Sequence, residues 1–152
     1  INQEPSLNLK LFFVDKFDVI TMWYVIEHIK DLKSTLSSVN KMLKFGGVFS
    51  FSTPNANGLT RKIDEAKFFN QSPKDHFSLW ELPLTKKYLK PFGFKVIKIV
   101  STGIHPERIP FVTKFHLDKN KFVFNFLKAI IKLLKIGDTY EVYCKKINGP
   151  KV

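Results

Sequence analysis

The sequence predicts an α/β fold on three observations: a short apolar run, a helical stretch after it, and a second apolar run that follows two glycines. The first run covers 17–23 and the second covers 48–53. Between them, Leu32, Leu36 and Val39 recur at the spacing of one helical face. A strand, a helix and a strand joined by short links form a βαβ unit, so the two strands are expected to be parallel.

Local signals mark the ends of these first elements. The first strand is nearly all apolar, which is typical of a parallel strand buried on both faces. Asp31 is the expected N-cap of the following helix. That helix is predicted to run to residue 44 and to stop at Gly46 and Gly47.

The rest of the chain continues the alternation of helices and strands, while residues 1–16 fit either a strand or an irregular connection. The expected elements are a helix at 59–69, a short helix around 84–92, a strand at 94–100, an excursion at 101–118, a helix at 119–136 and a final strand at 139–145. Because no repeat or linker interrupts them, residues 1–152 are expected to form one domain.

The composition is globular and strongly basic. The chain has 25 lysines and arginines against 13 acidic residues, which gives a net charge of +12. Such an excess attracts polyanions. Only Arg61 and Arg108 are arginines, however, and the direct reading of bases favours arginine, so no specific nucleic-acid partner is expected. A noncatalytic basic module that binds polyanions stays open as an alternative.

Three features bear on the location of the protein. A single cysteine, Cys144, excludes an internal disulfide and suits a reducing compartment. Residues 1–20 show no signal peptide. No stretch reaches the roughly 18 apolar residues that a membrane span needs. We therefore expect a cytoplasmic protein.

Two segments at a characteristic spacing resemble one enzyme family. Residues 17–29, FDVITMWYVIEHI, and residues 42–55, MLKFGGVFSFSTPN, resemble the fourth and fifth strand regions of class I S-adenosylmethionine-dependent methyltransferases. The branch that they resemble most holds quinone O-methyltransferases and methyltransferases of polysaccharide clusters. Later parts of the same fold are matched, in order, by His76-Phe77-Ser78, by 89–95 and by Gly137-Asp138.

The resemblance implies a partial Rossmann-like fold with strands four to seven of the sheet, the last one antiparallel and beside 94–100, and with helices on both faces. It also implies S-adenosylmethionine as the cofactor and O-methylation of a small-molecule, glycan or lipid-linked acceptor. The family's glycine-rich loop and the acidic end of its second strand have no counterpart here. We therefore expect a fragment that is inactive alone, with its N-terminal strands upstream of Ile1.

The end of the first strand supplies the candidate cofactor-binding residues, because ligands of open α/β sheets bind at the carboxyl ends of the strands. Thr21, Met22 and Trp23 match the family positions around the amino-acid end of the cofactor, and Tyr24 and Glu27 follow in the same loop. Packing of the sheet against a helix explains Met22 and Trp23 equally well.

His28 and His76 are the candidate catalytic residues, since imidazole is the natural base near neutral pH. For His28, a role in structure or in the cofactor pocket is the alternative. In the quinone O-methyltransferases, a glutamate three positions before the Glu27-His28 pair contributes to a metal site. Tyr24 stands at that position here, so no metal is expected.

Two further residues and one helix are candidates for contact with the acceptor. Asn55 follows the second strand and Trp80 offers an apolar wall, although turn formation and core packing also explain them. The helix at 119–136 carries lysines beside a broad apolar face, which allows peripheral contact with an anionic membrane. The alternative is a helix that covers the sheet just before its last strand.

Overall fold

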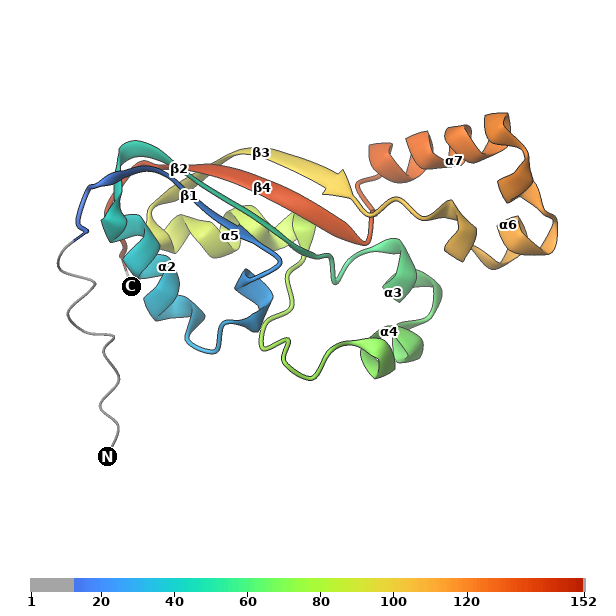
Figure 1. Cartoon of the computed structure of the whole chain (residues 1–152), viewed down its shortest axis with the longest axis horizontal. Helices are drawn as coiled ribbons and strands as arrows, with labels where there is room; N and C mark the ends of the chain where they lie inside the picture. Colours follow the sequence, from blue (N-terminus) through green and yellow to red (C-terminus); the bar gives the residue numbers. More distant parts are fainter. Residues whose placement is uncertain (1–12, 152) are drawn as a thin grey trace.

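A computed structural model describes residues 13–151, in which four strands form one sheet (Figure 1). The strands are β1 (Phe17–Trp23), β2 (Leu43–Pro54), β3 (Phe94–Thr102) and β4 (Thr139–Lys146), arranged in the order β1-β2-β4-β3. β1 and β2 are parallel, and β4 is antiparallel to both of its neighbours. The predicted α/β fold, the parallel first pair and the antiparallel last strand beside β3 are therefore confirmed.

The helices lie in two groups (Figure 1). α2 and α5 lie along one face of the sheet, whereas α3, α4, α6 and α7 lie beyond the carboxyl ends of β2 and β3. The helices are α2 (Leu32–Met42), α3 (Leu59–Ile63), α4 (Glu65–Gln71), α5 (Thr85–Leu89), α6 (Pro110–Lys114) and α7 (Lys121–Leu133). Single turns of 3-10 helix are η1 (Ile26–His28), η2 (Leu82–Leu84), η3 (Lys90–Phe92), η4 (Pro106–Arg108) and η5 (Leu117–Lys119).

The core lies between the sheet and the helices α2 and α5, which cover one of its faces. Phe49 and Phe51 of β2 are fully buried, and their ring centroids are 5.3 Å apart. Tyr140 of β4 is also fully buried, and its hydroxyl shares a 2.8 Å hydrogen bond with Thr85 of α5. Buried aromatic rings remove large apolar areas from water, so this layer holds the strands in place.

Helices cover only one face of the sheet in the described part of the chain (Figure 1), and the outer strand β1 is exposed on the other. Along β1, Ile20 and Met22 pack on the core, whereas Val19 is 56% exposed and Trp23 is 45% exposed. Successive side chains of a strand point to opposite faces, so β1 presents one apolar row to solvent. The expectations of a strand buried on both sides and of helices on both faces are wrong for these residues.

The glycine pair does not end a helix. α2 ends at Met42, and β2 begins at once with the fully buried Leu43, so Gly46 and Gly47 lie inside the strand. Gly46 has a φ of +78°, a left-handed conformation that glycine adopts without strain. The helix predicted to reach residue 44 is therefore shorter, because burial of Leu43 in the sheet prevails over the local helical pattern.

Aspartates cap two helices. Oδ1 of Asp31 accepts a 3.0 Å hydrogen bond from the backbone N–H of Ser34, as predicted for the start of α2. Asp64 accepts in the same way from Lys67 at 2.9 Å, and its extended backbone separates α3 from α4. The single helix predicted at 59–69 is thus two short helices, broken where Asp64 acts as a cap.

The excursion between β3 and β4 extends away from the sheet. α7 packs against η4 and η5 and lies past the strand ends (Figure 1), so the expectation of a helix that covers the sheet is wrong. Ile131 is the buried residue of α7, while Phe122 is 83% exposed and Leu133 is 81% exposed. Within residues 13–151, none of the helices has the length and apolar character to cross a bilayer.

Candidate functional site

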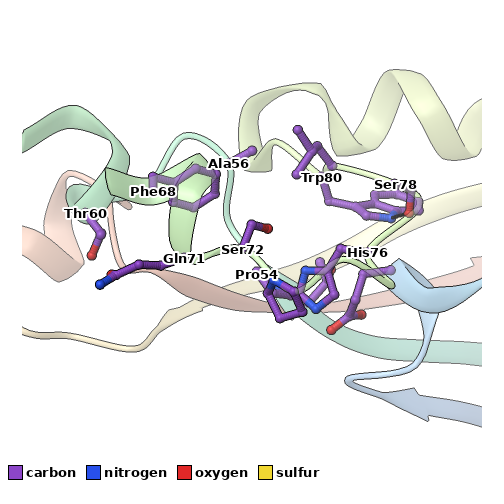
Figure 2. Close-up of a pocket in the computed structure, with 13 residues that line it drawn as sticks. Pro54, Ala56, Thr60, Phe68, Gln71, Ser72, His76, Ser78 and Trp80 are labelled. Atoms are coloured by element: carbon purple, nitrogen blue, oxygen red, sulfur yellow. Dashed lines mark hydrogen bonds between the residues drawn. The ribbon is translucent and has the colours of Figure 1, made fainter. Parts of the chain in front are cut away.

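A pocket of about 180 Å³ lies where β2 ends, at the edge of the sheet to which β1, β2 and β3 point. Thr53 and Pro54 of β2 form part of its wall. Phe68 lies toward one end of the pocket, and His76 and Trp80 lie toward the other (Figure 2). The carboxyl ends of the strands are where open α/β sheets bind their ligands.

Two polar groups of this pocket are buried without a partner. Glu27 is 1% exposed and Thr53 is fully buried. Among the described residues, no hydrogen bond reaches Oε2 of Glu27 or Oγ1 of Thr53. An unpaired buried polar atom is costly, and most of all an ionised one. Both oxygens are therefore available to a hydrogen-bond donor of a bound molecule or to a cation.

The loop 72–81 closes the pocket and is fixed to η1 through the backbone. The carbonyl oxygen of Glu27 accepts hydrogen bonds from Phe77 at 2.8 Å and from Ser78 at 3.2 Å. At the end of the loop, the carbonyl oxygen of Trp80 accepts from Ala56 at 2.8 Å. These bonds place His76 beside η1, although the two segments are far apart in the sequence.

Glu27, His28 and His76 form one cluster. One potential ligand atom of each lies within 4.8 Å of those of the other two. The imidazole rings of His28 and His76 meet edge to face, with centroids 4.7 Å apart. Nδ1 of His28 lies 3.0 Å from Oδ2 of Asp75 and 3.2 Å from its carbonyl oxygen. The structure thus brings both predicted catalytic histidines together with Glu27, which the sequence assigned to the cofactor.

The predicted cofactor positions 21–24 lie at the end of β1, beside this cluster. Tyr24 adopts a φ of +53°, and its N–H donates to the carbonyl oxygen of Ser52 at 3.2 Å and to Oγ of Ser52 at 3.1 Å. Positive φ is strained for a bulky side chain, so these bonds hold a sharp turn. Thr21, Trp23 and Tyr24 are exposed there, whereas Met22 packs on the core.

Asn55 and Trp80, the predicted acceptor contacts, are both buried. Nδ2 of Asn55 donates to the carbonyl oxygen of Gly137 at 2.9 Å, and Oδ1 accepts from Asn57 at 3.0 Å. The amide of Asn55 therefore ties neighbouring loops together, and its contact with an acceptor stays a prediction. Trp80 lines the pocket, and its ring centroid is 5.0 Å from that of Phe51.

Sequence reasoning missed three residues of the site. Thr53 was assigned only to the second strand, and Phe68 only to the helix predicted at 59–69. Asp75 orients His28, and its position directly before His76 was the available signal. The burial of Thr53 and the position of Phe68 depend on contacts between distant segments, which have no local sequence signature.

Cys144 is excluded as a nucleophile. It is fully buried in β4, and its Sγ lies 3.1 Å from the carbonyl oxygen of Phe49. Burial raises the pKa of the Cys144 thiol to about 12, so the reactive thiolate is scarce near neutral pH. The candidate chemistry is therefore that of a carboxylate and two imidazoles.

A family model described as a methyltransferase domain matches residues 3–99. The chain belongs to this methyltransferase domain family. No curated protein matches the sequence. The matched residues include β1, η1, α2, β2 and the loop that carries His76, so the family match spans the residues of the pocket.

Solved methyltransferase structures share the fold. A SAM-dependent methyltransferase from Archaeoglobus fulgidus superposes with a TM-score of 0.60 at 18% identity, over 96% of this chain and 66% of its own. A SAM-dependent methyltransferase from Thermotoga maritima, described as a possible histamine N-methyltransferase, gives 0.60 at 14% identity, over 88% and 57%. The chain thus spans less than two thirds of either relative, and at these identities the likeness establishes the Rossmann-like methyltransferase fold alone.

Proposed function

We propose that this methyltransferase domain uses S-adenosylmethionine to methylate a hydroxyl group of a small-molecule, glycan or lipid-linked acceptor. The observation that carries the proposal is the pocket at the carboxyl end of β2, with the buried, unpartnered carboxylate of Glu27 in its wall. Family membership supplies the type of chemistry, and the pocket supplies a place for the acceptor.

The reaction is an in-line displacement at the methyl carbon. The acceptor oxygen forms a bond to that carbon while the bond from carbon to the sulfonium sulfur breaks, and the electron pair stays on sulfur as the neutral thioether of S-adenosylhomocysteine. The proton of the hydroxyl must leave. Catalysis then consists mainly of placing the two partners in line and taking up this proton.

Different residues of the site would contact the cofactor and the acceptor. The exposed end of β1, with Thr21, Trp23 and Tyr24, would hold the cofactor, with Met22 supporting it from the core side. The acceptor would enter the pocket, where Trp80 forms one wall. Glu27, His28 and His76 would meet the acceptor's reactive oxygen, either by accepting its proton or through a bound cation.

The size of the pocket limits the acceptor group. Drug-sized ligands occupy cavities of about 300–1,000 Å³, and this pocket of about 180 Å³ is smaller. It therefore suits one ring-sized group of a larger acceptor. Phe68, Leu79 and Trp80 give it an apolar lining, as expected for the face of a sugar or phenol ring.

S-adenosylhomocysteine binding tests the proposal on the full natural protein that contains this chain. Isothermal titration calorimetry should give saturable binding, and Trp23→Ala and Tyr24→Ala should each weaken it by about tenfold or more, which is about 1.4 kcal/mol. Phe45→Ala is the matched control, because Phe45 is a 78% exposed aromatic residue near the opposite end of β2. The competing noncatalytic module predicts no saturable binding, and that result would refute the enzyme.

Peripheral membrane contact is a second candidate activity, favoured by the excursion around α6 and α7. Phe111, Phe115, Phe122 and Phe126 are 50–83% exposed. Exposed lysines flank them at positions 114, 119, 121, 128, 132 and 135. Aromatic residues beside lysines suit the boundary of an anionic bilayer, and such contact would bring a lipid-linked acceptor to the pocket.

Co-sedimentation with lipid vesicles tests whether the protein binds membranes. Vesicles that contain phosphatidylglycerol should sediment the protein, and those of phosphatidylcholine alone should do so less, with the difference shrinking at high salt. The double variant Phe122→Ser/Phe126→Ser should stay in the supernatant, whereas Phe45→Ser should behave like the parent. Equal sedimentation of all three proteins would contradict a role for α7.

A further inference from the structure

We propose that Glu27, His28 and His76 form a binding site for a divalent first-row metal ion such as Zn²⁺. One potential ligand atom of each lies within 4.8 Å of the others, and the three residues come from η1 and from the loop 72–81. Two imidazoles and one carboxylate are a donor set that zinc and its neighbours in the periodic table take in proteins.

The burial of Glu27 is an independent observation that points to a cation. Its side chain is 1% exposed, and Oε2 meets no hydrogen-bond partner among the described residues. A buried carboxylate without a partner is strongly destabilising, and a positive ion at the open side of the pocket removes that cost. Oγ1 of Thr53, also buried and unpartnered, lines the same pocket.

His28 makes the kind of second contact that supports a metal ligand. Nδ1 lies 3.0 Å from Oδ2 of Asp75, so an N–H on Nδ1 donates to this carboxylate and leaves the lone pair of Nε2 free. Histidines that bind metals commonly donate their second nitrogen to a carboxylate in this way, which fixes the ring and strengthens the ligand. Asp75 therefore acts as a positioning residue.

His76 supplies a third metal ligand that the sequence alone did not predict. The expectation of no metal rested on Tyr24, three positions before Glu27, where the resembling enzymes carry a glutamate. In the folded chain a third donor arrives from the other side of the pocket, because the carbonyl oxygen of Glu27 anchors the loop that carries His76. The substitution at Tyr24 thus does not remove the site.

The ligand atoms of Glu27, His28 and His76 would have to move only slightly closer together to bind one ion. Zinc–nitrogen and zinc–oxygen bonds are about 2.0–2.2 Å long, so ligand atoms around one tetrahedral ion stand roughly 3.3–3.6 Å apart. The 4.8 Å limit of the cluster shrinks to this range through a movement of about 1 Å.

The ion would act at the position where the acceptor's oxygen binds. A divalent ion that coordinates a hydroxyl lowers the pKa of that hydroxyl, so the proton leaves to solvent before the methyl group is transferred. This role rests on the proposed function, whereas the ion site itself does not. Metal binding can therefore be measured with no cofactor or acceptor present.

The experiment is a titration of the chelator-treated full chain with Zn²⁺, followed by calorimetry, and with Co²⁺, followed by its visible absorption. One ion should bind per chain, and Co²⁺ should show the intense bands of a site with fewer than six ligands. Asp75→Asn should lower the affinity by roughly 10–100-fold, the usual effect of losing a supporting carboxylate. Glu27→Gln and His76→Asn should lower it by at least as much.

His105→Asn is the matched control, because His105 and Glu107 form a pair at 2.8 Å that finds no third metal ligand among residues 13–151. This variant should bind Zn²⁺ like the parent. Thermal unfolding of each metal-free variant checks the fold, and His76→Asn, on a half-buried loop residue, keeps the test valid if Glu27→Gln unfolds. The site is refuted if the parent shows no saturable binding, or if Glu27→Gln and His76→Asn bind as tightly as the parent.

Discussion

The sheet and the excursion at 103–136 are held in different ways. In the sheet, the side chains of Phe49 and Phe51 are fully buried, whereas Phe122 and Phe126 of α7 are 83% and 60% exposed. The excursion is tied to the rest of the fold by polar contacts, among them the ion pair of Arg108 with Asp138, and by a few buried apolar side chains such as Val112 and Ile131. The sheet is therefore stabilised mainly by apolar burial, whereas much of the apolar surface of the excursion is still available for binding.

Removing one phenylalanine from each region is the sharpest way to test this difference. Phe49→Ala deletes a fully buried ring and should lower the free energy of unfolding by about 3–5 kcal/mol. Phe122→Ala deletes an 83% exposed ring and should change it by no more than about 0.5 kcal/mol. Urea unfolding measures both values. Similar losses for the two variants would show that α7 is packed in solution.

The contacts around Asp138 are the next target. Its side chain is 12% exposed and accepts from the N–H of Thr60 at 2.7 Å and from Nη1 of Arg108 at 2.7 Å. Asp138→Ala leaves the N–H of Thr60 without this acceptor and removes the ion pair with Arg108, and it should cost about 1–3 kcal/mol. Limited proteolysis should also cleave 103–136 faster, because the excursion loses one of its attachments.

A surface ion pair gives the control for Asp138→Ala. Oε1 of Glu65 forms an ion pair with Nη2 of Arg61 at 2.7 Å, but the side chain of Glu65 is 62% exposed. Glu65→Gln should change stability by less than about 1 kcal/mol, since exposed pairs contribute little. An equal effect of the two substitutions, or cleavage of the excursion at the parental rate in Asp138→Ala, would mean that other contacts hold the excursion.

The fold was largely predictable from the sequence because its signals are local. The apolar runs at 17–23 and 48–53 and the cap at Asp31 identify the first βαβ unit, and the structure confirms it. The open face of the sheet was not predictable, since Val19 is apolar whether or not a helix covers it. Its 56% exposure depends on what lies opposite, which no local pattern records.

The candidate site was predictable only in part. His28 and His76 were identified as single residues, but their contact depends on the hydrogen bonds from Phe77 and Ser78 to the carbonyl oxygen of Glu27. Backbone bonds between distant segments leave no mark on residue type. The cluster, and with it the proposed metal site, therefore becomes visible only in the folded chain.

A substitution at Cys144 reports how tightly the centre of the sheet is closed. Cys144→Ala should cost about 1 kcal/mol near pH 7, the common size for a single substitution. Burial raises the pKa of the folded thiol from 9.0 to about 12, so the stability that the neutral thiol contributes is complete below pH 9 and is lost as pH rises toward 12. The stability difference between the parent and Cys144→Ala should therefore narrow as pH rises above 9 and then reverse, as urea unfolding at a series of pH values would measure. Thiol labelling of the folded protein at pH 8 should be slow, and rapid labelling there would show that β4 opens as readily as the excursion does.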